Sequence, residues 1–412
     1  MKLDALKSPR FRRFWFGSMG STGASQLYFV GLSWLMFKIT GSATYLGLLG
    51  LALSAPSIAA TLIGGLLADR ANRGRILLIT SFLAGVCLAI LTLLDVTGWV
   101  RVWHVLILAA LLGLVSGFDL PARVAFFPAL IEPSQMMSAV ALSSILWQGT
   151  RMILPAIGGL LIAAADTWLL FFLCTLGFAS MSWILLGLQD ASPASESQTH
   201  DRSLISAIRF IRSEKLFLVL IVMTYISMFF GTAYVQIMPV FAELLGSGEK
   251  GFGYLISATG IGSVSGTLLI SRFQHSPALG KAMMGGALLF VVSLAMFAGV
   301  IGLFAQSDWA FFGACFFAVI GGIGGSCFLI SSMTVLQLAV PDTLRGRVMG
   351  IHSITFSLIA LGGLLLGPLA ELFSAPAAVL IGAGVVGCSL LFFSLRFPQL
   401  WQLNGQKPVS SL

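Results

Sequence analysis

Gly65-Leu-Leu-Ala-Asp69-Arg70-Ala-Asn-Arg73-Gly-Arg75 is a short charged stretch that lies between two long apolar segments. On each side of it the chain runs for about 20 residues or more without a charge, which is long enough for a helix to cross a bilayer. A compact basic loop between two such helices is typical of the cytoplasmic side of a membrane protein. The stretch therefore predicts a helical hairpin whose turn lies in the cytoplasm.

The composition places the whole chain in a membrane. Its 412 residues are 58% hydrophobic and 9% charged, and the mean hydropathy is +0.99. Soluble domains carry roughly 25% charged residues. One water-facing domain cannot bury so much apolar surface, so lipid must be part of the solvent. This excludes soluble enzymes and soluble binding modules, and we expect no enzymatic activity.

The hydrophobic runs predict an all-α membrane protein with twelve transmembrane helices. The alternating strands of an outer-membrane barrel are absent from the sequence pattern. The expected helices span residues 14–37, 43–68, 76–97, 102–122, 138–163, 168–188, 216–242, 251–271, 282–304, 308–339, 348–372 and 376–395.

We expect these helices to form two pseudo-symmetric six-helix bundles. Residues 1–189 form the first bundle and residues 216–397 the second. A cytoplasmic linker, 190–215, joins them, and a cytoplasmic tail, 398–412, follows. The linker ends in Leu204–Arg212, where apolar residues at helical spacing alternate with arginines. That pattern predicts a helix lying in the membrane interface.

The two halves look like copies of one ancestral unit. Gly64–Arg70 aligns with Gly266–Arg272, and the Glu132-Pro133 turn aligns with Val340-Pro341, at offsets close to half the chain. Parallel six-helix repeats around a central site are a transporter architecture.

The charged residues give an orientation and exclude several partners. Most of the 23 Lys and Arg residues fall in segments that a twelve-helix chain with both termini inside places in the cytoplasm. We therefore expect a multi-pass protein of the bacterial inner membrane and, for its assembly, a monomer. The basic residues are scattered instead of forming one face, so nucleic acid is not an expected partner.

Cofactor and metal chemistry find no support in the sequence. The five cysteines form no CxxC pair, and no GKS or GKT loop for ATP phosphates is present. No cleavable signal peptide is visible at the N-terminus. We expect no cofactor and no metal, and a drive other than ATP.

The opening stretch carries a family likeness. Gly65-x-x-x-Asp69-Arg70-x-x-Arg73 resembles the loop motif between the second and third helices of the major facilitator superfamily. Asn72 stands where that family usually has glycine, and asparagine tolerates a left-handed turn. The resemblance implies a gating latch made of Gly65, Asp69, Arg70 and Arg73 that stabilises the outward-facing state. The alternative is a topology anchor with no gating role.

Further segments resemble one bacterial branch of the superfamily. Pro155, Gly158 and Gly159 look like the end of the antiporter motif, which marks exporters. Asp119–Arg123 and Val340–Val348 are similar to segments of macrolide efflux pumps and enterobactin-type siderophore exporters. The resemblance implies alternating access and proton-coupled export of a small amphipathic compound, either drug-like or a siderophore.

Three charged residues within the predicted helices are candidates for the mechanism. Arg151 lies near the middle of the fifth helix, where an unpaired arginine costs roughly 2.5–3.5 kcal/mol on insertion scales. It should therefore bind an anionic or polar substrate, set the proton affinity of a nearby acid, or pair with a buried carbonyl or glutamine. Asp119 is a candidate proton carrier, since burial can raise a carboxylate pKa. Arg123, four residues later on the same helical face, offers instead a charge relay.

Polar and aromatic residues within the spans are together candidates for lining a substrate cavity, although each taken singly is more typical of a helix–helix contact. They are Gln26, Tyr28, Trp34, Trp147, Gln148, Tyr225, Tyr234, Gln236 and Gln337, together with Arg151.

The sequence thus predicts a secondary exporter whose partners are a small-molecule substrate, protons and the lipid bilayer. An uptake permease or uncoupled facilitator for a small organic solute is the alternative. A non-transporting membrane receptor is a remote one, because it would need larger soluble loops.

Overall fold

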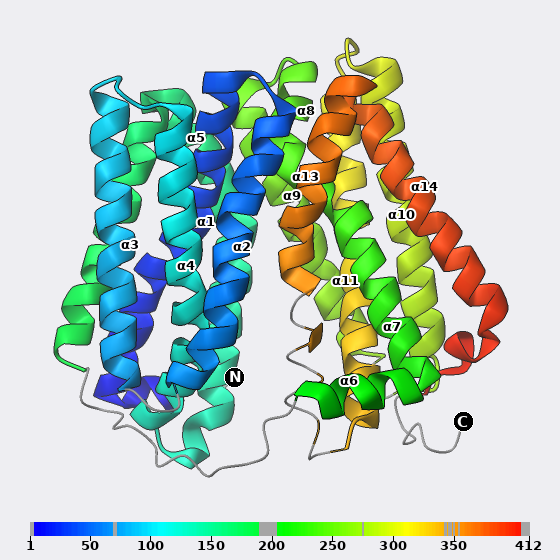
Figure 1. The fold of residues 1–412 in the computed structure, drawn as a ribbon, viewed down its shortest axis with the longest axis horizontal. Helices are drawn as coiled ribbons and strands as arrows, with labels where there is room; N and C mark the ends of the chain where they lie inside the picture. Colours follow the sequence, from blue (N-terminus) through cyan, green and yellow to red (C-terminus); the bar gives the residue numbers. More distant parts are fainter. Residues whose placement is uncertain are drawn as a thin grey trace. The chain divides into compact units, whose positions relative to one another are not determined.

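The computed structural model describes residues 4–68, 72–188, 204–273, 276–341, 344, 348, 351–352 and 355–404. Throughout this described part the regular secondary structure is helical (Figure 1). The chain divides into two compact units, one comprising Met1–Gly41 and Leu48–Thr199, the other Ser42–Gly47 and His200–Leu412.

The first unit contains most of the helices up to the predicted linker. In chain order they are η1 (Asp4–Lys7), α1 (Pro9–Thr40), α2 (Ala43–Ala68), α3 (Arg73–Val96), α4 (Val102–Phe126), η2 (Phe127–Leu130), η3 (Pro133–Gln135) and α5 (Met136–Leu186). The first residues of α2 cluster with the second unit.

The second unit holds the remaining elements. They are α6 (Leu204–Ser213), α7 (Lys215–Ile226), the π-helical η5 (Ser227–Gly231), η6 (Thr232–Ile237), α8 (Met238–Leu244), α9 (Gly248–Ser271), α10 (Leu279–Phe304), α11 (Ala310–Ala339), α13 (Thr355–Leu372), α14 (Ala375–Arg396) and η7 (Pro398–Gln402).

The helices agree with the all-α membrane class. Among the described residues, nine helices are long and apolar enough to cross a membrane. Two of the spans expected in the first unit, 138–163 and 168–188, share α5, which breaks at Ala165 and Asp166. Counting the two arms of α5 separately, with α1 and α13, gives six spans per unit.

Helix α1 starts earlier and ends later than expected. Ser8 caps its N-terminus by accepting a hydrogen bond from Phe11 N, and Pro9 occupies the first helical position. Gly41 ends it in the left-handed conformation (φ 61°), which glycine adopts without steric cost. The hydropathy window missed the first turns because Arg10, Arg12 and Arg13 belong to the helix but not to its apolar part.

The expected helix 216–242 is confirmed as a span, Lys215–Leu244, but the helix type changes within it. It is interrupted after Ile226 by a π-helical turn and a 3-10 segment before α8 begins at Met238. The 3-10 segment ends just before Pro239, which cannot donate an intrahelical hydrogen bond. A π-bulge and a proline are recognised causes of a broken helix.

The same kind of close glycine contact occurs within each of the two units. In the first unit, a Cβ on Gly117 of α4 would lie 2.5 Å from Ser57 O of α2. In the second, a Cβ on Gly266 of α9 would lie 2.5 Å from Ile323 O of α11. The second and fourth spans are therefore in backbone contact in each unit, as expected for duplicated bundles.

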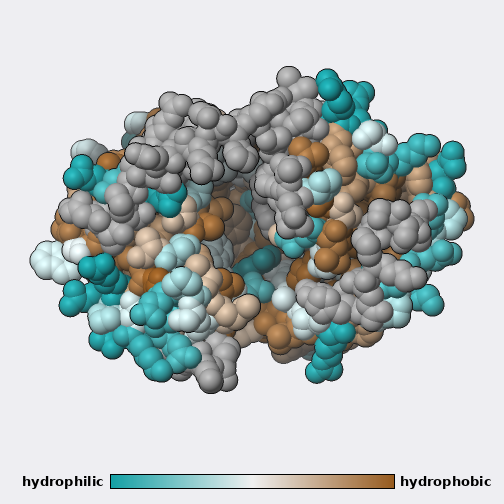
Figure 2. Space-filling view, turned by 90° about the horizontal axis from the view of Figure 1, so that it is seen from below, coloured by the Kyte–Doolittle hydropathy of each residue, from teal (hydrophilic) through white to brown (hydrophobic). Residues whose placement is uncertain are grey.

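Each unit has its own apolar core, and its outer faces are apolar as well. Phe126 and Leu185 are among the buried residues of the first core, and Phe328 and Leu336 among those of the second. In the view from below, hydrophilic side chains form separate patches with apolar side chains between them (Figure 2). Exposed apolar side chains such as Phe82 (60%) suit contact with lipid.

The linker and tail are only partly described. Residues 189–203 lie outside the described residues, and α6 occupies the end of the linker, crosswise to α7 (Figure 1). Ile211 of α6 is buried in the second core, whereas Arg209 and Arg212 are not. The first residues of the predicted tail form η7, and Leu400 is fully buried.

Candidate functional site

Asp119 and Arg123 form an ion pair on the C-terminal half of α4. Arg123 Nε donates to Asp119 Oδ2 over 2.9 Å, and its Nη2 donates to Oδ1 over 3.2 Å. The spacing of four residues brings the two side chains onto one face of the helix. Both side chains are largely buried, so the pair is shielded from the screening that weakens surface ion pairs.

Two hydroxyl side chains from other helices form hydrogen bonds with this ion pair. Thr80 of α3 donates to Asp119 Oδ1 over 3.1 Å. Arg123 Nη1 donates to Ser18 Oγ of α1 over 3.1 Å. The network thereby ties α1, α3 and α4 together, and it satisfies polar groups that would be costly to bury alone. The sequence analysis missed Ser18 and Thr80, because a hydroxyl within a span carries no sign of its partner on another helix.

Of the four residues of the predicted latch, Arg73 at the start of α3 is the one whose side-chain contacts the structure describes. Arg73 Nη1 donates to Ala125 O at the end of α4 over 3.2 Å. Asp69 and Arg70 lie outside the described residues, and of Gly65 only its place within α2 is described. The gating role of this loop stays a prediction.

Asn72 does not occupy a left-handed turn. Its φ of −66° and ψ of 112° are extended, and its Oδ1 accepts a hydrogen bond from Arg75 N over 3.2 Å. Asn72 is therefore the N-cap of α3. Asparagine is among the preferred N-cap residues, which explains its place here better than tolerance of positive φ.

Arg151 lies near the middle of the first arm of α5, and its side chain is exposed. Trp147, one turn earlier, is also exposed (44%), and Ser144 continues the same face. Within the described residues Arg151 has no hydrogen bond or ion pair. A guanidinium at this depth, without a protein partner, offers up to five donors to a ligand.

The predicted antiporter motif forms a packing surface. Pro155, Gly158 and Gly159 are buried on α5. A Cβ on Gly158 would lie 3.2 Å from Leu27 Cδ2 and 3.3 Å from Val30 Cγ1 of α1. These residues hold α5 against α1, and any part that they play in antiport stays a prediction.

The predicted cavity residues fall into two groups. Gln337 is exposed and Gln26, Tyr28 and Gln148 are half-buried, so these side chains can reach solvent or a ligand, as can Trp147 and Arg151.

The other group is engaged in contacts within the protein. Trp34 is buried and packs on Phe37 of the same helix, and Tyr234 is buried against Phe297 of α10. Gln236 is buried too, and the half-buried Tyr225 donates its hydroxyl to Ile351 O over 2.6 Å. For these four, contact with substrate stays a prediction.

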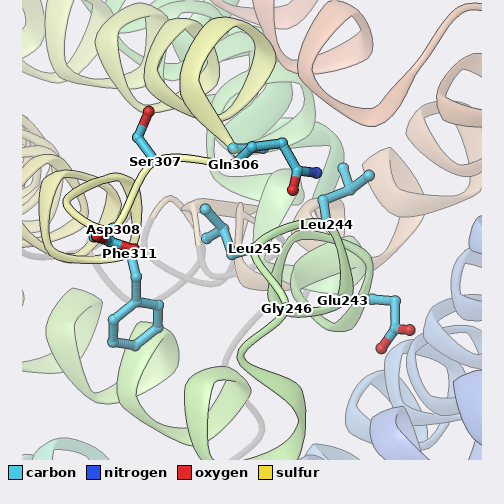
Figure 3. A pocket seen from close by; sticks show the side chains of 9 residues that line it. Glu243, Leu244, Leu245, Gly246, Gln306, Ser307, Asp308 and Phe311 are labelled. Atoms are coloured by element: carbon cyan, nitrogen blue, oxygen red, sulfur yellow. The ribbon is translucent and has the colours of Figure 1, made fainter.

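A separate pocket of about 400 Å³ lies between loops of the second unit. It is bounded by the end of α8 and the turn after it (Glu243–Gly246) and by the turn between α10 and α11 (Ala305–Asp308), with Phe311 at its edge (Figure 3). In Figure 3 the carboxylate of Glu243 points away from Asp308. None of the predicted cavity residues lines this pocket.

Comparison with known proteins agrees with the architecture. The family model described as transmembrane secretion effector matches residues 2–409. The chain belongs to this family of the major facilitator superfamily. It is thus a multi-pass membrane transporter for small molecules.

Curated relatives cover nearly the whole chain. The Staphyloferrin A transporter of Staphylococcus aureus is 24% identical over 386 residues, which cover 89% of this chain and 91% of that protein. The Enterobactin exporter EntS of Shigella flexneri is 26% identical over 396 residues, with 92% and 87% coverage. Both relatives are named for a siderophore.

Solved structures support the fold. The nucleoside transporter NupG matches with a TM-score of 0.71 at 12% identity, covering 94% of this chain and 99% of that one. A bacterial homologue of the iron transporter ferroportin matches with a TM-score of 0.72 at 14% identity, covering 96% and 99%. At this identity the likeness concerns the fold alone.

Proposed function

We propose that this protein exports an anionic, iron-chelating small molecule of the siderophore class across the bacterial inner membrane. Export is coupled to proton entry and proceeds by alternating access. The protein works as a monomer with both termini in the cytoplasm. The two curated relatives support the substrate class, and the family described as a secretion effector supports the direction.

Arg151 is the observation that carries this proposal. Iron chelators bind through oxygen donors that become anionic when they lose their protons. A guanidinium binds such oxygens through two parallel hydrogen bonds, and its planar face can also stack on aromatic rings. Trp147, one turn away on the same exposed face, adds an aromatic surface. An acidic aromatic or carboxylate chelator therefore fits these two side chains.

The Asp119–Arg123 pair fits a charge relay better than a freestanding proton carrier. Both carboxylate oxygens of Asp119 are already engaged, one by the guanidinium alone and the other by the guanidinium and Thr80. A group held in this way acts together with its partners. We propose that this pair transmits movement between α1, α3 and α4, and that protons are carried elsewhere.

Transport into sealed vesicles tests the function. The purified protein is reconstituted in liposomes, and uptake of an iron-free catechol or hydroxycarboxylate chelator is followed with and without an imposed pH gradient. We expect gradient-driven accumulation of the chelator in vesicles that are acidic inside, together with proton efflux. Accumulation that ignores the pH gradient would favour a facilitator. Failure to move either chelator would overturn the proposed substrate class.

A deletion strain gives the matching observation in cells. Loss of an exporter lowers the chelator in the medium and raises it in the cell. Loss of an uptake permease does the opposite, which would favour the alternative function.

A further inference from the structure

His352 is a buried titratable group in the second unit that the mechanism above does not use. Its side chain is 2% exposed, and its Nε2 has no hydrogen-bond partner among the described residues. Burying an unpaired polar atom costs free energy, so such an atom usually has a function or an ordered water beside it. His352 is therefore a candidate for a functional role.

Other unpaired polar atoms lie in the segments around it. Thr355, three residues later, is fully buried, and its Oγ1 has no partner among the described residues. Ser331 of α11 is also fully buried, and its Oγ has no partner among the described residues. Its neighbour Ser332 shares a hydrogen bond of 3.2 Å with Thr224 of α7.

Helix α7 is hydrogen-bonded to the residue before His352. The hydroxyl of Tyr225 donates to Ile351 O, directly before His352. The adjacent Thr224 shares a hydrogen bond with Ser332 of α11, so consecutive residues of α7 bond to Ile351 and to the residue after Ser331. Buried polar atoms without protein partners are suited to hold water, which can carry protons.

In the described part of the second unit, no charged side chain of the surrounding helices pairs with His352. Its imidazole can therefore be neutral and can take up a proton. Lys215, Arg272, Lys281 and Arg396 lie at the ends of α7, α9, α10 and α14, and all four side chains are exposed. The titratable groups within α7 and α11 are Tyr225, Cys315 and Cys327, and α13 carries Glu371 at its far end. None of these side chains is hydrogen-bonded to His352 in the described part of the chain. Arg345 and Arg347 lie outside it.

We infer that His352, with the hydroxyls of Thr355 and Ser331, is a proton-binding site of the second unit. The imidazole Nε2 takes up one proton while substrate is absent and releases it during the export cycle. This rests on the proposed proton-coupled export and assigns the proton to a residue other than Asp119.

Two measurements test the site in the full-length protein. The first is NMR of the protein in detergent with isotope-labelled histidine, in which the signal missing from the His352→Gln variant is assigned to His352. We expect this signal to change from the neutral to the protonated form as the pH is lowered, and the midpoint to move in the Thr355→Val variant. A His352 signal that stays neutral at every pH at which the protein remains folded would overturn the inference, whatever the protein transports.

The second measurement is transport by the reconstituted variant. In His352→Gln we expect gradient-driven accumulation of the catechol chelator to fall about tenfold or more. Exchange of labelled for unlabelled chelator without a pH gradient should stay within about twofold of wild type, because binding and movement remain intact.

His104→Gln is the matched control. His104 accepts a hydrogen bond from Arg101 N at the start of α4, and we expect its variant to accumulate chelator as wild type does. If wild type accumulates the chelator and His352→Gln does so equally, the inference fails and the proposed function stands. If wild type accumulates none, the proposed function fails, and the NMR titration still decides the proton site.

Discussion

At the scale of single residues, three charged side chains of the first unit have different surroundings. Arg151 is exposed without a partner in the described part, Asp119 is paired within its own helix, and Asp166 anchors a helix break. The first two were predicted as functional candidates from their depth in the spans. Asp166 was not, because a lone acid between two apolar runs is typical of an ordinary turn.

Replacing Arg151 by Gln should abolish transport of an anionic chelator while the protein still inserts and folds. The loss of a charge-assisted bidentate contact removes about 1.5–3 kcal/mol of binding, or roughly tenfold to over a hundredfold in affinity. Vesicle uptake and chelator binding measure this effect. Arg101→Gln, at the exposed start of α4, is the control. Uptake at the wild-type rate by the Arg151 variant would show that Arg151 does not bind the substrate.

The charge-relay role of Asp119 predicts that its loss and the loss of Arg123 are equivalent. Asp119→Asn and Arg123→Gln should each lower transport, and the double variant should be no worse than either, since the residues act as one unit. Transport rates of the four proteins in vesicles form the cycle. Additive losses would contradict the relay, and an Asp119→Asn protein that exchanges chelator normally but ignores the pH gradient would return Asp119 to the role of proton carrier.

Asp166 has a backbone conformation that favours glycine, with φ 67° and ψ −178°. Its carboxylate accepts from Lys38 Nζ over 2.5 Å and from Thr167 N over 2.8 Å. Asp166→Gly removes strain of about 1–3 kcal/mol and an exposed ion pair of at most about 1 kcal/mol.

The glycine variant should therefore be as stable as wild type or more so, whereas Asp166→Ala keeps the strain and should be less stable. Thermal unfolding in detergent separates the two variants. A glycine variant less stable than the alanine variant would show that the strain argument is wrong.

At the scale of elements, glycine determines which helices touch. A Cβ on Gly113 of α4 would lie 2.1 Å from Leu53 O of α2, and one on Gly20 of α1 would lie 3.0 Å from Gly177 O on the second arm of α5. The sequence shows the many glycines but not which of them face another backbone, since that depends on the rotation of each helix about its axis.

Gly117→Ala should destabilise the first unit, because the new methyl group would lie 2.5 Å from Ser57 O, which is backbone. We expect a cost of about 1–3 kcal/mol. Gly149→Ala is the control, since its Cβ would meet nothing within 4 Å, and it should be neutral or stabilising by up to about 1 kcal/mol. Thermal unfolding of both variants in detergent tests the contact, and equal stability would contradict it.

At the scale of the whole molecule, the six-span repeat follows from hydropathy, whereas the proposed orientation follows from the basic residues. Most of the predicted helices match described ones, with ends shifted by a few residues. The break at Ser227–Ile237 was not predicted, because a π-helical turn keeps the hydropathy of a continuous span.

The orientation predicts the outcome of a reporter assay. Fluorescent protein fused at either terminus should fluoresce, because we place both termini in the cytoplasm. Alkaline phosphatase inserted in the turn at Gly246–Gly248 should be active, since we place that turn outside. An inactive phosphatase at this site, with an equal amount of inserted protein, would contradict the proposed topology.

The sequence by itself determined the membrane class, the number of spans and the family likeness. These depend on local properties: hydropathy over about 20 residues, the distribution of Lys and Arg, and short motifs. Only the tertiary structure decided that Asp119 bonds Thr80, that Arg123 bonds Ser18, and that His352 is buried with its Nε2 unpaired among the described residues. Such contacts join residues far apart in the chain, and helix packing selects them through side-chain shape that no single segment encodes.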